Sequence, residues 1–155
     1  MQKTIVNGAL RIAYPDTYTA LTPAELKQMY RDDSTDRWSV RNAEEHRTVT
    51  VMWKKYAWPA VLMPDNAAIA RNNERLMREG LKSYSYALDG FFETELCGQK
   101  GCGYDYAYTN QGIAVKVKTV LFRHHSTVWS VSFYWRAAEE NPSEMIREIL
   151  ASMEF

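Results

Sequence analysis

The chain lacks the long apolar run that a membrane-spanning helix needs. No apolar stretch approaches the roughly 18 to 20 residues that cross a bilayer, and the first residues lack the basic start and apolar centre of a signal peptide. Net charge is also absent, because nineteen Lys and Arg balance nineteen Asp and Glu. Nucleic acid and anionic membranes are therefore not expected as partners. We expect a cytoplasmic protein, or an exported one if a leader or lipid anchor was removed ahead of Met1.

Cysteine and histidine are scarce, with two and three residues in the chain. Cys97 and Cys102 are compatible with a disulfide, a redox pair or half of a metal site, but no second Cys or His pair stands at ligand spacing. We expect two reduced structural thiols, no metal ion and no cofactor. His124 and His125 are neighbours on a predicted strand and point to opposite faces, unless a turn at Ser126 brings them together.

A catalytic signature is missing as well. The glycines of Gly98-x-x-Gly101-x-Gly103 join two strands rather than a strand and a helix, so they predict a turn and not a phosphate loop. Glu93, Glu95 and Asp105 lie on adjacent predicted strands, near enough for an acid/base pair, but exposed strand positions explain them without a substrate. No catalytic residue is predicted.

What the chain does contain is enough apolar material for one core. Its 155 residues are 46% hydrophobic and 13% aromatic, which suits a single domain over 1–155. Asn7-Gly8 predicts a tight hairpin, and alternation of apolar and polar residues predicts strands throughout the chain. The predicted strands are about 3–6, 9–14, 37–41, 46–56, 88–96, 103–108, 113–118 and 129–135.

Three helices are predicted from caps and from apolar residues at helical spacing. A capping box at Thr22 begins a helix over about 23–31, Asp65 caps a helix over about 66–82, and Asn141 caps one over about 142–153. The residues expected to face inward are Leu26, Met29 and Tyr30 in the first helix, Ile69, Asn73, Leu76, Gly80 and Leu81 in the second, and Ile146, Ile149 and Leu150 in the third. Those expected in solvent on the second helix are Arg71, Glu74, Arg75 and Arg78. The fold class is therefore α+β, a central antiparallel sheet of at least five strands flanked by about three helices.

Three short segments resemble the PsbP-like family. They are Leu10-Arg11-Ile12-Ala13-Tyr14-Pro15-Asp16 at the start, the glycine turn from Gly98 to Gly103, and the closing Ile149-Leu150-Ala151-Ser152-Met153-Glu154-Phe155. The family includes the photosystem protein PsbP, the Ran-binding Mog protein, and DcrB-type and mycobacterial lipoproteins. The resemblance implies a central antiparallel sheet packed between helices and non-enzymatic binding roles. It carries over no catalytic residue and assigns neither Ran nor a photosystem partner.

Aromatic residues are the strongest remaining signal. Tyr104, Tyr106 and Tyr108 share one face of a strand, and Trp53, Tyr56 and Trp58 cluster near the end of another. Half-buried sheets favour such residues as core, whereas interfaces favour them as anchors. Trp129, Phe133 and Trp135 are expected in the core. The predicted binding surface consists of Tyr56, Trp58, Tyr104, Tyr106 and Arg123, with Lys54 and Lys55 also at its polar margin.

These observations predict a non-enzymatic binding or accessory module whose partner is a protein. Two other classes stay open at this point. One is a small-molecule binder or an enzyme, using a cleft beside the sheet lined by Tyr104, Tyr106 and the nearby carboxylates. The other is an immunity protein for a toxin, or a chaperone-like protein.

Overall fold

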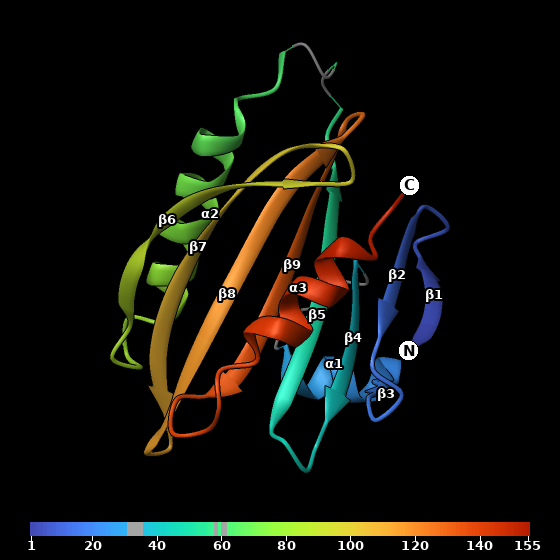
Figure 1. The fold of residues 1–155 in the computed structure, drawn as a ribbon. Coiled ribbons are helices and arrows are strands. Elements are labelled where there is room, and N and C mark those ends of the chain that lie inside the picture. Colours follow the sequence, from blue (N-terminus) through green and yellow to red (C-terminus); the bar gives the residue numbers. More distant parts are fainter. Residues whose placement is uncertain (31–35, 58, 60–61) are drawn as a thin grey trace.

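A computed structural model describes residues 1–30, 36–57, 59 and 62–155 (Figure 1). Within these residues, one antiparallel sheet has seven strands in the order β3-β4-β5-β9-β8-β7-β6, and β1 and β2 form a separate hairpin. The strands are β1 Gln2–Val6, β2 Leu10–Tyr14, β3 Thr19–Ala20, β4 Arg37–Asn42, β5 Arg47–Lys55, β6 Ala87–Leu96, β7 Gln99–Asn110, β8 Ile113–His124 and β9 Thr127–Arg136. The helices are α1 Pro23–Met29, α2 Asn66–Gly80 and α3 Ser143–Ala151. The predicted α+β class is confirmed.

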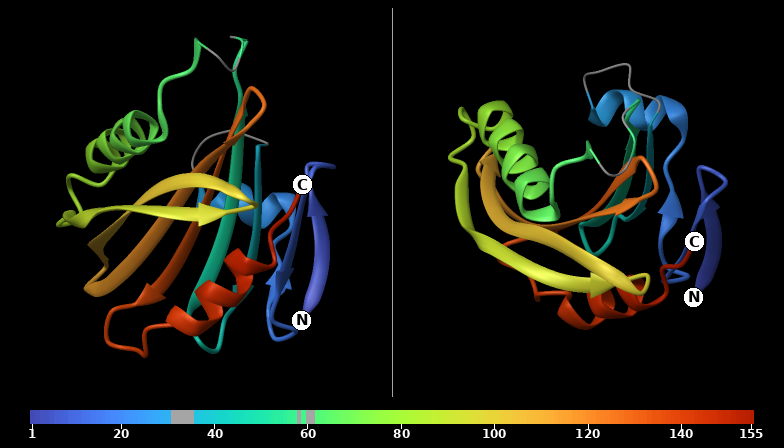
Figure 2. Two further views of the ribbon diagram at one scale, coloured as in Figure 1. Left: turned by 45° about the horizontal axis from the view of Figure 1, so that its top comes forward. Right: turned by 90° about the horizontal axis from the view of Figure 1, so that it is seen from above.

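The sheet lies between two layers (Figure 2). Helices α1 and α2 lie on one face, and α3 with the β1–β2 hairpin lies on the other. Each face has its own apolar cluster, because side chains alternate between the faces of a strand. On β5, for example, Val49 and Val51 pack on the α3 side, whereas Met52 points to the α2 side.

The hairpins turn at residues with positive φ. Asn7 and Gly8 have φ of 51° and 64°, as the Asn-Gly pair predicts, and Cys97 and Gly98 have φ of 53° and 68°. The predicted glycine-rich tip from Cys97 to Cys102 is therefore wrong in extent. Only Cys97 and Gly98 turn the chain, and β7 begins at Gln99.

Gly103 lies within strand β7, at a position where a side chain has no room. A Cβ atom on it would lie 2.2 Å from the backbone oxygen of Thr119 and 2.4 Å from the ring of Phe92. The ring of Phe92 thus lies across the position that a side chain of residue 103 would fill. The glycine serves close packing between β6 and β8, not a turn.

Helix α3 docks on the sheet through the predicted residues. Ile146 and Ile149 are 4% and 0% exposed, and Leu150 is half-buried. The predicted Asn141 cap is wrong, because the helix starts at Ser143 and the cap position is Pro142, which offers no side-chain hydrogen bond. After α3, Glu154 pairs with Arg11 of β2 through two backbone hydrogen bonds of 2.7 and 3.1 Å.

Helix α1 begins with the predicted capping box but is short. Thr22 Oγ1 accepts from the Glu25 amide, and the Glu25 carboxylate accepts from the Thr22 amide. The helix ends at Met29, and that side chain is 42% exposed, so its predicted inward position is wrong. Tyr30, next to it, is half-buried and shares a 2.8 Å hydrogen bond with Thr50 Oγ1 of β5.

The inward face of helix α2 agrees with the prediction only in part: Ile69 and Leu81 pack against the α2-side cluster, whereas Gly80 is exposed. Ala70 and Glu74 are its buried residues, at 0% and 3% exposed, whereas Leu76 is 55% exposed. The helix lies over a row of tyrosines on β7, and a small residue such as Ala70 allows it to approach their rings. The predictions that Leu76 is inward and Glu74 is solvated are both wrong.

Candidate functional site

A row of hydroxyl groups runs across the α2 side of the sheet. Directly paired positions on neighbouring strands carry, in order, Ser39, Thr50, Ser132, Thr119 and Tyr104. Two of the neighbouring pairs, Ser39 with Thr50 and Thr119 with Ser132, share buried hydrogen bonds of 2.8 Å. These bonds satisfy polar groups that burial would otherwise leave without a partner. The row fixes the register of the strands beneath the candidate site.

Tyr104 and Tyr106 lie at the end of this row, beneath α2. They are 0% and 1% exposed, and their ring centroids are 5.5 Å apart. The Tyr104 hydroxyl donates to Oδ1 of Asn73 on α2. Burial, followed by the charge of neighbouring phenols, raises the pKa of both phenol groups well above its ordinary value. Their predicted exposure is wrong, because the aromatic face of β7 is covered by α2.

Glu74 is a carboxylate turned into the same interface. Its side chain is 4% exposed, and Nε of the exposed Arg78 approaches it at 3.4 Å. Burial, and after it the negative charge of Glu74, raises the pKa of Tyr86 to about 12. Glu74 therefore lies buried between α2 and the sheet, with its charge opposed by Arg78 on the same helix.

A groove of about 320 Å³ runs between α2 and the β5–β9 part of the sheet. Ile69, Asn72 and Leu76 form its wall on α2, since positions three, four and seven apart share one side of a helix. Met52 and Tyr56 line the opposite side. The groove is thus bordered by half-buried and exposed apolar side chains.

The predicted binding residues separate into different environments. Tyr56 is half-buried in the wall of the groove, and its amide donates to Ser126 O at 2.9 Å. Trp58 lies outside the described residues. Arg123 is half-buried near the end of β8, and its carbonyl accepts from the Gln99 side chain. Of the predicted surface, Tyr56 and the marginal Lys54 therefore line the groove.

Some residues of the groove were missed by the sequence reasoning. Leu76 was expected in the core and is exposed instead, whereas Ile69 packs against the core as expected and also lines the groove. Met52 was placed only on the face opposite Val51. The signal was present in β5, where Met52 and Lys54 alternate with the core residues. It could not be used, because the position of α2 over that face depends on tertiary packing.

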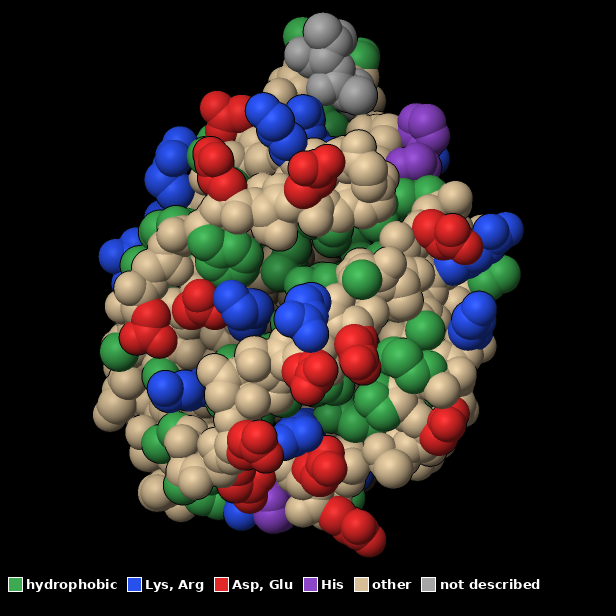
Figure 3. Space-filling view, viewed as in Figure 1, with side chains coloured by type: hydrophobic (Ala, Val, Ile, Leu, Met, Phe, Trp, Pro, Cys, Tyr) green, Lys and Arg blue, Asp and Glu red, His purple; other side chains and the backbone are tan. Residues whose placement is uncertain are grey.

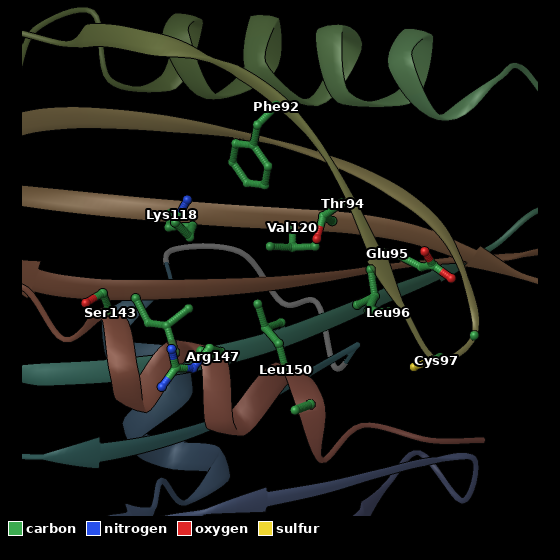
Figure 4. A pocket seen from close by; sticks show the side chains of 13 residues that line it. Phe92, Thr94, Glu95, Leu96, Cys97, Lys118, Val120, Ser143, Arg147 and Leu150 are labelled. Atoms are coloured by element: carbon green, nitrogen blue, oxygen red, sulfur yellow. The ribbon is translucent and has the colours of Figure 1, made fainter.

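A second hollow lies on the opposite face, between β6 and α3. It has a volume of about 560 Å³, and Figure 4 shows Phe92, Thr94 and Leu96 on one side and Arg147 and Leu150 on the other. The space-filling view shows hydrophobic side chains along this hollow with both kinds of charged side chain around it (Figure 3). Two cations at the hollow already have acidic neighbours: Lys118 lies 3.0 Å from Asp105, and Arg147 lies 3.5 Å from Glu144.

The two cysteines point to opposite sides of the sheet. Cys97 packs against the α3-side cluster and Cys102 belongs to the α2-side cluster, and both are free thiols. Burial raises the pKa of both thiols. A bond between them would require one side chain to cross the sheet.

Histidines and carboxylates also occupy separate places. The turn at His125 and Ser126 brings the ring centroids of His124 and His125 to within 4.2 Å of each other, and the His124 ring stacks on the Phe155 ring with centroids 3.7 Å apart.

The carboxylates considered as an acid/base pair lie on opposite faces of the sheet. Asp105 lies on the α3 side with Lys118, whereas Glu93 is paired in register with Cys102 on the α2 side. Glu93 and Asp105 therefore do not form the acid/base pair that was considered.

The described part of the chain holds neither a cluster of metal-ligating side chains nor a helix that could span a membrane. There, no group of three or more His, Cys, Asp or Glu side chains is placed to hold a metal ion. None of the helices described is both long and apolar enough to cross a membrane.

Comparison with solved structures identifies the fold. No protein-family model and no curated protein matches the sequence. Cyanobacterial PsbP (CyanoP) from Synechocystis sp. PCC 6803 superposes with a TM-score of 0.70 at 10% identity, covering 99% of this chain and 91% of that protein. The Ran-binding protein Mog1p of Saccharomyces cerevisiae gives a TM-score of 0.66 at 9% identity, covering 99% and 94%. The chain therefore has the PsbP-like fold, as its sequence motifs predict.

A third structure differs in size. A protein of Bacteroides thetaiotaomicron VPI-5482 matches with a TM-score of 0.59 at 12% identity over 98% of this chain. This chain spans about half of that protein, 47% of its length. At such identities the comparisons show a common fold, and function has to be argued from the site.

Proposed function

We propose that the protein is a non-enzymatic binding module that docks a partner protein in the groove beside α2. The observation that carries the proposal is the position of Leu76, which is 55% exposed on the groove wall of an otherwise well-packed helix. Ile69, Met52 and Tyr56 extend the apolar surface around it. Apolar and aromatic side chains of this kind anchor protein interfaces.

The comparisons support the class of function only by analogy. Mog1p, which shares the fold, is a Ran-binding protein. The predicted role of Tyr104 and Tyr106 is revised within this proposal: Tyr104 holds Asn73 in the groove wall from beneath, and neither ring makes direct contact with a partner. Tyr56 keeps its predicted role. A role for Arg123 at the margin remains a prediction.

Site-specific photocrosslinking tests the docking site. A photoreactive phenylalanine analogue at position 76 is expected to form a defined crosslink to one protein in cells of the native organism, identified by mass spectrometry. The Leu76→Glu variant is expected to weaken that complex by about 2 kcal/mol, with an unchanged melting temperature because the residue is exposed.

Leu88 provides a matched control, since it is a leucine on β6 that is 39% exposed. Leu88→Glu should leave the complex intact. Crosslinks that form equally from positions 76 and 88, or a complex insensitive to Leu76→Glu, would count against the groove. The cell fraction that yields the crosslink also tests the expected cytoplasmic location.

A second candidate, binding of a small molecule, is favoured by the hollow between β6 and α3. Its volume of about 560 Å³ lies within the range of ligand pockets, and Phe92, Val120 and Leu150 give it an apolar lining. Native mass spectrometry of protein purified from its own organism separates the two candidates. A stoichiometric metabolite released on unfolding, without a protein crosslink at position 76, would favour the second candidate.

A further inference from the structure

The charge and the hydrogen-bonding groups of the groove beside α2 indicate which kind of protein segment would bind there. Resting on the function proposed above, we infer that its occupant is an acidic amphipathic segment of the partner protein. Apolar side chains of this segment fill the groove, and its carboxylates lie along the rim. Four independent features of the described residues lead to this assignment.

The first feature is the spacing of apolar positions. Ile69 and Leu76 are seven residues apart on α2, which places them about 10.5 Å apart along one side of the helix. Met52 faces them from β5. Two apolar side chains at a similar separation on an incoming segment would contact both, as in helix-in-groove recognition.

The second feature is the charge of the lining. Among the described residues that line the groove, Lys54 is the one charged side chain, and none is Asp or Glu. Lys54 is exposed, and its Nζ lies 5.3 Å from the centroid of the Tyr56 ring. An ammonium group at the mouth of an apolar groove attracts a carboxylate, and the low polarity of the walls strengthens that attraction.

The third feature is the buried Glu74. Because this carboxylate is turned inward and paired with Arg78, the exposed surface of α2 presents Arg71 and Arg75 as its remaining cations against Glu79. The surface of α2 next to the groove therefore carries more cations than anions. An acidic segment gains from this surface, whereas a basic segment is repelled by it.

The fourth feature is the orientation of two amides in the groove wall. Oδ1 of Asn72 accepts from Nη2 of Arg75 at 3.1 Å, and Oδ1 of Asn73 accepts from the Tyr104 hydroxyl. Both oxygens are thus engaged, so each side chain has its NH₂ group left to offer as a donor. Donors in the wall suit a ligand rich in acceptors, and carboxylates are the strongest acceptors among side chains.

The hollow between β6 and α3 shows why this preference belongs to the α2 side. There, Lys118 lies beside Asp105 and Arg147 beside Glu144, so its cations are already neutralised. Such a surface has no comparable preference for a negative partner.

Peptide selection tests the charge without knowledge of the partner. A random library of peptides of about 12 to 15 residues is displayed and selected on the full chain, with Leu76→Glu protein used to remove peptides that bind elsewhere. We expect the retained peptides to be enriched in Asp and Glu over Lys and Arg, with apolar residues three, four or seven apart. Their binding should weaken at least tenfold in the Lys54→Glu variant and as salt rises from ~0.05 to ~0.5 M.

Lys116→Glu is the matched control, because Lys116 is an exposed lysine on the α3 side. This variant should bind the selected peptides as tightly as the native protein does. Enrichment of basic or uncharged peptides, equal binding to Lys54→Glu, or no groove-dependent peptide at all would overturn the acidic assignment. Such results would leave the proposed function standing if the crosslink at position 76 forms, since that experiment does not depend on charge.

Discussion

Glu74 and Leu76, two residues apart on α2, are placed against their usual preferences, with the carboxylate in the core and the leucine in solvent. Burial of Glu74 is compensated by the Arg78 guanidinium at 3.4 Å. Exposure of Leu76 has no compensation within the described chain, and the free energy of covering it is available to a partner. Neither position could be predicted from the sequence, because a periodic pattern gives the spacing of residues on a helix face but does not say which face meets the sheet.

A single methyl group at Gly103 is predicted to be strongly destabilising. Gly103→Ala places a Cβ atom 2.2 Å from the backbone oxygen of Thr119, and β8 must move to relieve the overlap. We expect a loss of about 1–3 kcal/mol in the free energy of unfolding, measured by urea denaturation.

Gly90 provides the control for this substitution. It lies on the adjacent strand β6, and a Cβ atom there meets nothing within 4 Å. Gly90→Ala should change stability little. Equal stability of the Gly103→Ala and native proteins would show that the strands are not packed as described.

At the scale of elements, α3 shows how a sequence stripe becomes a docked helix. The predicted stripe is confirmed for Ile146 and Ile149, because large aliphatic residues at helical spacing leave only one face able to bury apolar area. The prediction held for α2 only in part: Ile69 and Leu81 pack inward, but the buried residues of the helix are the small Ala70 and the charged Glu74. The same reasoning failed at the cap of α3, since the sequence Asn141-Pro142 allows two starting points one residue apart.

Ile149→Asp is predicted to undock α3. The side chain is 0% exposed, so the substitution buries a charge without a partner and should cost about 3–5 kcal/mol. Thermal or urea unfolding measures the loss. Glu148→Asp, at an exposed position on the same helix, should have little effect, and an unchanged melting temperature for Ile149→Asp would contradict the docking of α3.

At the scale of the whole molecule, buried phenols make stability depend on alkaline pH. Burial raises the pKa of Tyr18 and of Tyr86 to about 12, whereas an unfolded tyrosine titrates near pH 10. Between these values the unfolded chain loses protons that the folded chain keeps. The contribution of these tyrosines is therefore complete below about pH 10 and is lost progressively as the pH rises toward about 12.

Denaturation across this range checks the prediction. The urea midpoint should fall between about pH 10 and pH 12, and the part of the tyrosinate absorbance that comes from the buried phenols should rise together with unfolding rather than before it. Tyr86→Phe should make the fall less steep. A midpoint that stays constant to pH 12, or early and complete tyrosine ionisation in the folded state, would contradict burial of these phenols.

The sequence alone determined the kinds of element, their order and the fold class. Asn7-Gly8, the capping box at Thr22 and the alternation along β5 act within a few residues, so their outcome does not depend on distant parts of the chain. Only the tertiary structure decided which surfaces remained exposed. The position of α2 covers Tyr104 and Tyr106, turns Glu74 inward and leaves Leu76 beside a groove, because packing between distant elements selects one face of each.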